Sequence, residues 1–542
     1  MSFVQSAPRL GDLYHDDRML RSTLARLLPE PMLRAADADF AALADYAQRT
    51  WPRSTRTPRE PVLTQWDVYG HRIDRIELTP TWQEGPTIAA MRGLVADGHD
   101  PALREFCRVQ QFAKVYLYHA ASAFYSCPLA MTDGVATALR DAPNAALRER
   151  VLPHLLSRDP ATFWISGQWM TETAGGSDVA GSETTARRDA DGSWRLAGRK
   201  WFTSAINAEV ALALARPEGN PAGADGLALF LIETRTTDGR WNGITVDRLK
   251  DKLGTRELPT AEIHLDHTRA ELVGDTRHGV RAIAPVLQVT RLWNAFGALS
   301  TMARCLALTR DYAARRRVFG KPLGEQPLFA DSLADSEAEF EAAFQLAMQV
   351  ALLLGRVESG QGTPRDAALQ RLLTPLAKLW VCRLGVHIAS ATVEAFGGIG
   401  YLEDSGIPVL LRDAQVLPIW EGSGNVQALD FLRALAKSGI EPLVTAVDGW
   451  LEAADGVLRD EDAEAIHAAI LHADTWLRDH ADAAPALQAG ASRLALTAAR
   501  ATAAALLARH AQWAERAQHD GAPARHLRRF CARRIDRIVD LP

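Results

Sequence analysis

The pattern of apolar residues changes twice along this chain, and these two changes limit the folds that the chain can adopt. Between about residues 161 and 275, short runs of β-branched and aromatic residues alternate with Gly, Pro, Asp and Asn, which is the pattern of short strands joined by turns. On either side, apolar residues recur at helical spacing over longer segments. Because short strands bury their apolar faces most simply against one another, we expect a small sandwich or barrel between helical domains. The predicted fold class is α+β and mostly α.

Individual elements follow from the same patterns. Residues 184–188 and 194–203 predict a hairpin, and residues 261–265 alternate apolar and polar side chains as a half-buried strand does. Two Pro-containing segments, 51–61 and 79–86, are expected to be loops. Apolar periodicity predicts helices at 102–129, 144–156, 291–316, 332–357 and 375–396. The predicted domains are a helical domain at 1–160, a β-domain at 161–275, a helical domain at 276–440 and an Ala- and Leu-rich helical extension at 441–542.

Composition excludes several classes of partner. The formal net charge of -5 gives no global reason to expect nucleic acid or an anionic membrane. The five cysteines are dispersed and form no CxxC pair, so no structural zinc site and no other metal site is predicted. Residues 1–16 lack a basic segment followed by an apolar run, and we find no apolar stretch of the roughly 20 residues that span a bilayer. The expectation is a soluble, cytoplasmic protein.

One glycine-containing loop stands out inside the β-region. Segment 168–178 carries adjacent glycines at 175 and 176, with hydroxyls at Thr171 and Ser177. Glycines let backbone N–H groups approach a polar ligand without obstruction by side chains. A plain turn between strands explains the same residues equally well, so both interpretations remain open.

Three further segments offer weaker signals. Trp201 ends the predicted hairpin beside hydroxyls and could form a wall of a flat aromatic site, although a core tryptophan is commoner. The arginines at 315–317 close a long helix, where they complement its dipole or could bind a diphosphate. The glycines at 397, 398 and 400 follow a helix and could form only a C-cap.

Glu421 is a candidate general base. It lies between Trp420 and Gly422, with Ile419 before them, and an apolar environment would raise its pKa toward neutrality, as proton abstraction requires. A glutamate that merely stabilises a helix N-terminus is the alternative.

In their joint order, these segments resemble the acyl-CoA dehydrogenase family over about residues 60–435. The motifs that carry the resemblance are Met170-Thr171-Glu172, Gly176-Ser177-Asp178, Lys200-Trp201-Phe202-Thr203, Asp251-Lys252-Leu253-Gly254-Thr255-Arg256, Arg316-Arg317-Val318-Phe319-Gly320, Phe396-Gly397-Gly398-Ile399-Gly400 and Trp420-Glu421-Gly422. The chain length, the run from Trp420 to Asn425 and the extra C-terminal helical region are similar to the AidB-like branch. That branch includes the adaptive response protein to DNA alkylation and acyl-CoA-binding proteins of animals.

The resemblance implies an N-terminal helical domain, a middle β-domain and a C-terminal four-helix bundle, assembled as a homotetramer. It implies bound FAD, with contacts at Gln168, Met170, Thr171, Ser177, Trp201, Thr203, Ser423 and Asn425. It also implies that Arg316, Gly397 and Gly398 reach the FAD of a neighbouring subunit.

The implied reaction is α,β-dehydrogenation of an acyl-CoA thioester. Glu421 would remove the α-proton while the β-hydrogen leaves as hydride to FAD, and Thr290 and Arg291 would lie near the substrate. Two departures from the family are visible. Glu394 stands near the Gly-Gly turn where the family commonly has Gln, and an acid there would need a partner such as Arg316. Ser423-Gly424-Asn425 replaces the Thr-Ser-Gln more usual in short-chain enzymes.

The extension suggests a second class of function. Arg528 and Arg529 belong to an arginine-rich closing segment that could contact DNA phosphates, and Arg433 matches an arginine linked to DNA binding in the AidB-like branch. A solvated helix face paired with acids such as those at 461, 462 and 464 is the alternative. The second hypothesis is therefore a flavoprotein that binds DNA or acyl-CoA and has only residual turnover.

Overall fold

The computed structural model describes residues 5–54 and 60–539, which form two compact units. The first, called the barrel unit, contains residues 60–99 and 122–293. The second, called the helical unit, contains residues 5–54, 100–121 and 294–539. Each unit is built from segments that are distant in sequence, and each contains parts of more than one predicted domain.

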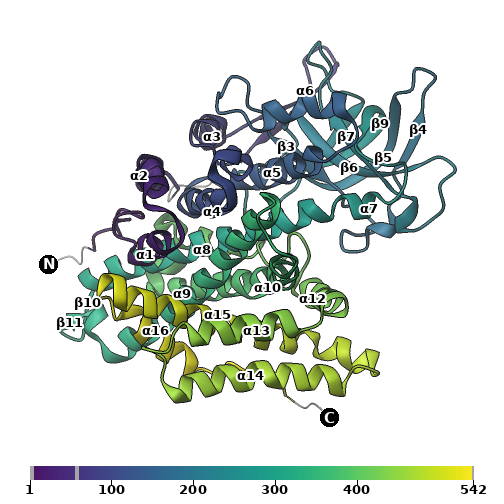
Figure 1. Cartoon of the computed structure of the whole chain (residues 1–542). Helices are drawn as coiled ribbons and strands as arrows, with labels where there is room; N and C mark the ends of the chain where they lie inside the picture. Colours follow the sequence, from purple (N-terminus) through teal and green to yellow (C-terminus); the bar gives the residue numbers. More distant parts are fainter. Residues whose placement is uncertain (1–4, 55–59, 540–542) are drawn as a thin grey trace. The chain divides into compact units, whose positions relative to one another are not determined.

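A closed ring of strands lies at the centre of the barrel unit (Figure 1). Its strands are β3 (Ser166–Trp169), β4 (Thr185–Arg188), β5 (Trp194–Ser204), β6 (Val210–Pro217), β7 (Ala228–Glu233), β8 (Ile244–Leu249) and β9 (Thr260–Leu272). The ladder runs from β6 through β4, β5, β9 and β7 and returns to β6, while β3 pairs with β6 and β8 with β9. The predicted barrel, its hairpin and the strand at 261–265 are therefore confirmed.

Alternating side chains give β6 and β7 two different apolar faces. In β6, Leu212 and Leu214 belong to a core that also contains Leu139 of α5 (Ser126–Arg140) and Val151 of α6 (Ala145–Leu155). Ala211 and Ala213 belong to the second core, inside the ring. Small alanines inside and large leucines outside fit a narrow barrel interior and a helix-covered exterior. This packing fixes the loops that leave β3 and β5.

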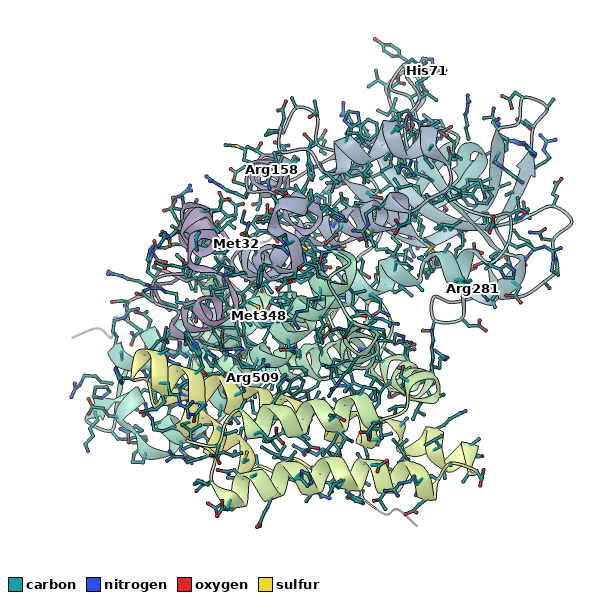
Figure 2. All side chains as sticks on the ribbon, viewed as in Figure 1. Met32, His71, Arg158, Arg281, Met348 and Arg509 are labelled. Atoms are coloured by element: carbon teal, nitrogen blue, oxygen red, sulfur yellow. The ribbon has the colours of Figure 1, made fainter. Side chains whose placement is uncertain are left out.

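The remaining elements of the barrel unit are β1 (Val62–Trp66), β2 (Arg72–Glu77), α3 (Pro80–Met91), α5 (Ser126–Arg140), α6 (Ala145–Leu155), α7 (Gly279–Ala282) and residues 284–293 of α8. The sequence did not predict the β1–β2 hairpin, whose exposed turn carries His71 (Figure 2). The loop predicted at 79–86 is wrong, because Pro80 occupies the first turn of α3, where proline costs no hydrogen bond. Of the loop predicted at 51–61, residues 51–54 belong to a helix, which contradicts the prediction, and 55–59 lie outside the described residues.

The helical unit contains α1 (Arg18–Leu27), α2 (Glu30–Ser54), α4 (Cys107–Tyr118), the rest of α8 (Ala284–Arg315), β10 (Arg317–Val318), β11 (Lys321–Pro322), α9 (Pro327–Glu358), α10 (Pro364–Ala395), α11 (Ile407–Ala414), α12 (Gly424–Ser438), α13 (Glu441–Glu452), α14 (Asp460–Asp479), α15 (Ala484–Gln518) and α16 (Ala522–Cys531). The single helix predicted at 102–129 is wrong. A 3-10 turn precedes α4, and Ala123 and Phe124 have left-handed φ angles before α5 begins.

The C-terminal extension packs onto the long helices that precede it. Helices α13, α14 and α16 lie around α15, and α15 and α16 also contact α9 (Figure 1). Arg509 of α15 donates to Gln349 of α9 at 2.8 Å. Figure 2 labels Arg509 and Met348, the residue that precedes Gln349 in α9. The extension is therefore part of the helical unit rather than an appended tail.

Among the residues that the structure describes, two helices are long and apolar enough to cross a bilayer, contrary to the sequence expectation. These are α9 and α10, whose most apolar windows are 89% and 83% buried inside the protein. Long core helices meet the same criterion, and the burial of both places them in the centre of the helical unit.

Candidate active site

A buried ion pair fixes the glycine-containing loop after β3. Lys200 donates to Glu172 at 2.6 Å, and Glu172 also accepts from the Thr184 hydroxyl at 2.6 Å. Burial opposes ionisation of both groups and lowers the pKa of Lys200. For Glu172, burial is outweighed by the attraction of Lys200 and by hydrogen bonds, which lower the pKa of the carboxyl. The pair ties the start of the loop to β5 and β4.

Two of the predicted FAD-contacting residues, Thr171 and Trp201, lie next to each other. The Trp201 backbone N–H donates to the Thr171 carbonyl at 2.9 Å. A Cβ atom at Gly176 would lie 2.7 Å from the Thr171 hydroxyl oxygen, so only glycine allows this close approach. Lys250 lies 3.5 Å above the Trp201 ring, which makes this a cationic as well as an aromatic surface.

The other predicted residues of the barrel unit differ in accessibility. Ser177 is exposed, and Met170 is buried at the base of the loop. Gln168 is half-buried, and its Oε1 is shielded with no hydrogen-bond partner among the described residues. Thr203 is fully buried and its hydroxyl donates to the Ala261 carbonyl at 2.6 Å. Gln168 thus presents an acceptor that a bound donor would satisfy.

The two predicted substrate residues lie on α8 within the barrel unit. Thr290 is buried and its hydroxyl donates to the Val286 carbonyl at 3.1 Å. Arg291 is also buried. Both side chains are thus positioned by a rigid helix.

Glu421 occupies a strained position in the helical unit. Its φ is 56°, in the left-handed region, and Gly422 follows with φ of 100°. Lys378 of α10 donates to the Gly422 carbonyl at 2.6 Å, and Gln427 of α12 donates to the Glu421 carbonyl at 2.8 Å. The side chain is half-buried and its Oε2 is shielded from solvent. Two helices therefore hold the backbone of an acid whose conformation has a cost, as is common at functional sites.

Ser423 and Asn425 open the helix that follows Glu421. Ser423 is the N-cap of α12, yet its side chain makes no capping hydrogen bond, and both residues are exposed. Gly424 between them is buried, and a Cβ there would lie 2.9 Å from the Arg383 guanidinium. The N-terminus of α12 is thus arranged for polar or anionic groups.

A cavity of about 1050 Å³ in the helical unit brings together Arg316, Gly397 and Gly398. A Cβ atom added at either glycine would meet nothing within 4 Å, so their backbones face open space. Glu394 lies in the same cavity, whose other walls are mainly apolar. Its edge is exposed, with Phe319 97% and Leu328 81% accessible.

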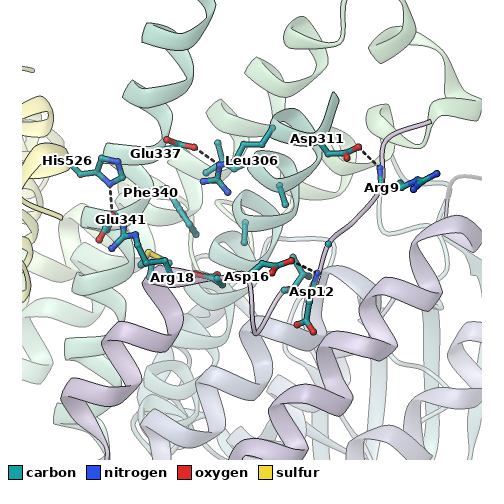
Figure 3. A pocket seen from close by; sticks show the side chains of 17 residues that line it. Arg9, Asp12, Asp16, Arg18, Leu306, Asp311, Glu337, Phe340, Glu341 and His526 are labelled. Carbon is teal, nitrogen blue, oxygen red and sulfur yellow. Dashed lines mark hydrogen bonds and ion pairs between the residues drawn. The ribbon is translucent and has the colours of Figure 1, made fainter. Parts of the chain in front are cut away.

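A second cavity of about 560 Å³ lies between the N-terminal segment, α8 and α9 (Figure 3). Its charges are largely paired: Arg310 with Glu337 at 2.5 Å, and both Arg18 and His526 with Glu341 at 2.7 and 2.5 Å. We find no sequence motif of the predicted site among its lining residues.

The predicted DNA-contacting arginines lie in different environments. Arg529 pairs with Asp331 at 2.8 Å and with Asp335 at 2.7 Å, both on α9. Arg528 is exposed, and the Arg433 side chain is 70% exposed. The sequence suggested Glu461 and Asp462 as partners of the C-terminal arginines, and this is wrong, because both acids pair with Arg459.

Several residues that position the site were missed from the sequence. Lys378 holds the Glu421 loop and Glu172 with Lys200 holds the glycine loop. For Lys378, the available signal was a lone lysine inside an apolar run, because a charge there requires a polar partner.

Three successive parts of the chain match domains of known protein families. Residues 6–160 match the N-terminal domain of adaptive response protein AidB, 167–268 the acyl-CoA dehydrogenase middle domain, and 277–436 the acyl-CoA dehydrogenase C-terminal domain. Acyl-CoA dehydrogenase family member 11 of Caenorhabditis elegans is 38% identical over 94% of this chain and 86% of its own length. AidB of Escherichia coli is 35% identical over 71% of each chain. The crystal structure of the C. elegans protein ACDH-11, in complex with C11-CoA, superposes with a TM-score of 0.95 over 100% of this chain and 94% of that one, at 37% identity.

Proposed function

The chain belongs to the acyl-CoA dehydrogenase family, and on this premise we propose that it binds FAD and catalyses α,β-dehydrogenation of an acyl-CoA thioester. The observation that carries the proposal is Glu421, held in a left-handed conformation between α10 and α12. Nothing in the packing of an ordinary helix start requires a non-glycine residue with positive φ at this position. A strained, partly shielded carboxylate is suited to proton abstraction.

The described residues fit the cofactor. Gln168 offers an acceptor oxygen that lacks a donor, and the Gly397-Gly398 backbone faces an open cavity that also contains Arg316. Arginine and exposed backbone N–H groups are suited to a diphosphate, and Trp201 to a flat ring system. Ser423 and Asn425 would contribute polar groups from the start of α12. FAD, when bound, supplies the acceptor for the hydride that leaves the β-carbon.

In the proposed reaction, one carboxylate oxygen of Glu421 takes the α-proton. The electron pair of that C–H bond forms the new double bond as the β-hydrogen departs with its own pair. Shielding of Oε2 keeps water away from the oxygen that receives the proton. Lys378 and Gln427 act on the backbone, so they fix where the carboxylate points without joining the proton transfer.

The acyl chain proposed is of medium length. The C. elegans relative whose structure matches this chain was crystallised with C11-CoA. We therefore expect thioesters of roughly this length to bind better than four-carbon ones.

An anaerobic titration tests both the reaction and the substrate. The FAD-loaded protein is mixed with saturated acyl-CoAs of increasing chain length while the flavin absorbance is followed. We expect the flavin to be bleached by the wild type and not by Glu421→Gln, which preserves shape but lacks a basic oxygen. A drop of at least 10³-fold in the bleaching rate corresponds to about 4 kcal/mol of barrier. Glu464→Gln, at an exposed glutamate of α14, is the matched control, and equal bleaching by both variants would refute the assignment of the base.

The proposed assembly is a homotetramer in which a second copy covers the large cavity of the helical unit. Phe319 and Leu328 at its edge are almost fully accessible, and the exposed Tyr401 and Leu402 follow the Gly-Gly turn. Exposed apolar groups around a cavity are typical of interfaces. Such a contact would carry Arg316 to the neighbouring copy's cofactor.

DNA binding by the extension is the second candidate function, favoured by the exposure of Arg433 and Arg528. If it occurs, retention of a DNA duplex will fall steeply with salt, and Arg433→Ala with Arg528→Ala will reduce the slope of log affinity against log salt by about 2. Arg529→Ala is the control, because that arginine is paired with two acids. Salt-independent retention, or an unchanged slope, would exclude phosphate contacts by these residues.

A further inference from the structure

Arg304 of α8 is a buried cation, and one edge of its guanidinium donates no hydrogen bond to the described residues. Its side chain is 1% exposed, and Nη1 donates to the Ala120 carbonyl. Among the residues that the structure describes, Nε and Nη2 have no hydrogen-bond partner. These two nitrogens form one edge of the guanidinium plane, so the missing partner is a single group with two acceptors side by side.

Other arginines of this protein show what that edge normally binds. In the fully buried Arg108, Nε and Nη2 donate to the two carboxylate oxygens of Glu358 at 2.5 and 3.1 Å. In Arg459, the same two nitrogens donate to both oxygens of Asp462 at 2.7 and 3.0 Å. Within the described part of the chain, Arg304 therefore lacks the carboxylate that binds the same edge of the guanidinium in Arg108 and Arg459.

The groups around Arg304 do not replace that anion. The Trp51 ring centroid lies 5.5 Å from its Cζ, and a tryptophan carries no charge. Burial, followed by the proximity of Arg304, lowers the pKa of His119 to about 3, so this imidazole is neutral. Burial raises the pKa of the adjacent Cys305 thiol to about 12, so it is not a thiolate. Burial likewise lowers the pKa of Arg304 itself to about 10, which still leaves the guanidinium charged at neutral pH.

The site is built from three rigid elements. Tyr118 ends α4 and stacks on Tyr46 of α2 with ring centroids 5.9 Å apart. The Ala120 N–H donates to the Ser300 hydroxyl of α8 at 3.0 Å, one turn before Arg304. These contacts fix the guanidinium, because its acceptor Ala120 is itself tied to the same helix.

From this geometry we propose that Arg304 is an internal carboxylate-binding site between α2, α4 and α8, filled in the working protein by a small planar carboxylate or by the carboxylate end of an aliphatic ligand. Two parallel N–H donors on a rigid plane select a planar oxyanion over a spherical one. The aromatic rings of Trp51, Tyr46 and Tyr118 provide an apolar surround in which such a pair is strong. This site is separate from the residues assigned to proton abstraction.

Thermal unfolding of the full-length, FAD-loaded protein tests the proposal. Chloride is replaced at constant ionic strength by formate, acetate or decanoate. We expect carboxylates to raise the melting temperature saturably over chloride, because a ligand that binds only the folded state stabilises it. A response at lower concentration to decanoate than to formate would identify the aliphatic source, and the reverse order the small anion.

Variants separate the site from general salt effects. Arg304→Met should remove the carboxylate response. In chloride, its melting temperature should equal or exceed that of the wild type, because the substitution removes a buried charge that has no counter-ion among the described residues. Arg304→Lys keeps the charge but lacks the fork and should also lose the response. Arg150→Met, whose Nε and Nη2 edge is already occupied by Glu233, should retain it. A wild type that melts identically in chloride and carboxylates, a response that survives in Arg304→Met, or a crystal structure with only water along that edge would overturn the proposal.

Discussion

Removing one partner of the Arg500–Glu339 pair should destabilise the whole helical unit. Arg500 of α15 donates two parallel hydrogen bonds to Glu339 of α9 at 2.7 and 2.9 Å, and the two side chains are only 4% and 10% exposed. Glu339→Ala leaves the guanidinium buried against the Phe530 ring, 4.3 Å away, without its carboxylate. The loss of one member of a buried pair costs about 3–5 kcal/mol. With an unfolding entropy of about 2.1 cal/mol/K per residue over 542 residues, the melting temperature should fall by roughly 3–4 °C.

The measurement is thermal unfolding followed by circular dichroism, with two matched variants. Arg529→Ala removes a more exposed pair with Asp331 and should cost less than about 1 kcal/mol. Glu339→Leu combined with Arg500→Met replaces both charges and should recover most of the loss, because neither charge then remains buried alone. The stabilising role of the pair is refuted if Glu339→Ala has the same melting temperature as Arg529→Ala. It is also refuted if the double variant melts no higher than Glu339→Ala.

The remaining predictions concern the barrel unit and the assembly. Because the pKa of Glu172 lies below its ordinary value in the folded protein, the unfolded chain binds the proton first; the pair's stabilisation is therefore present above about pH 5 and lost as pH falls. Glu172→Gln should lower the melting temperature at pH 7 and flatten its fall in acid, and an unchanged acid profile would contradict the assigned role. Phe319→Asp should dissociate the assembly in light scattering and release FAD, whereas Tyr69→Asp, on the exposed β1–β2 turn of the barrel unit, should do neither; an intact assembly with Phe319→Asp would remove Phe319 from the interface.

Periodicity predicted the elements whose partners are local in sequence. The hairpin of β4 and β5 and the helix α6 were recovered because alternation and an N-cap, here Asn144, are local signals. The helix at 102–129 was over-extended because its apolar pattern continues past Tyr118, while the backbone turns at Ala123 and Phe124 through left-handed conformations that the sequence does not mark. The β1–β2 hairpin was missed since its strands are short and its apolar side chains, such as Leu63 and Ile76, pack against the distant barrel core.

For the candidate site, the sequence singled out individual residues but did not predict which charged or polar side chains would contact them. Glu421, Arg316 and the Gly397-Gly398 turn could be singled out because an acid between apolar residues and glycines, arginines at a helix end and paired glycines are visible in the sequence. Their supports come from other helices, as Lys378 does for Glu421. The same limitation applies to Arg304, which reads as one arginine among many on a long helix. Only its packing reveals that one edge of the guanidinium is buried without an acceptor. A buried donor is costly when it is left unsatisfied, so the deficit itself implies a ligand, and tertiary structure rather than sequence is where such a deficit first becomes visible.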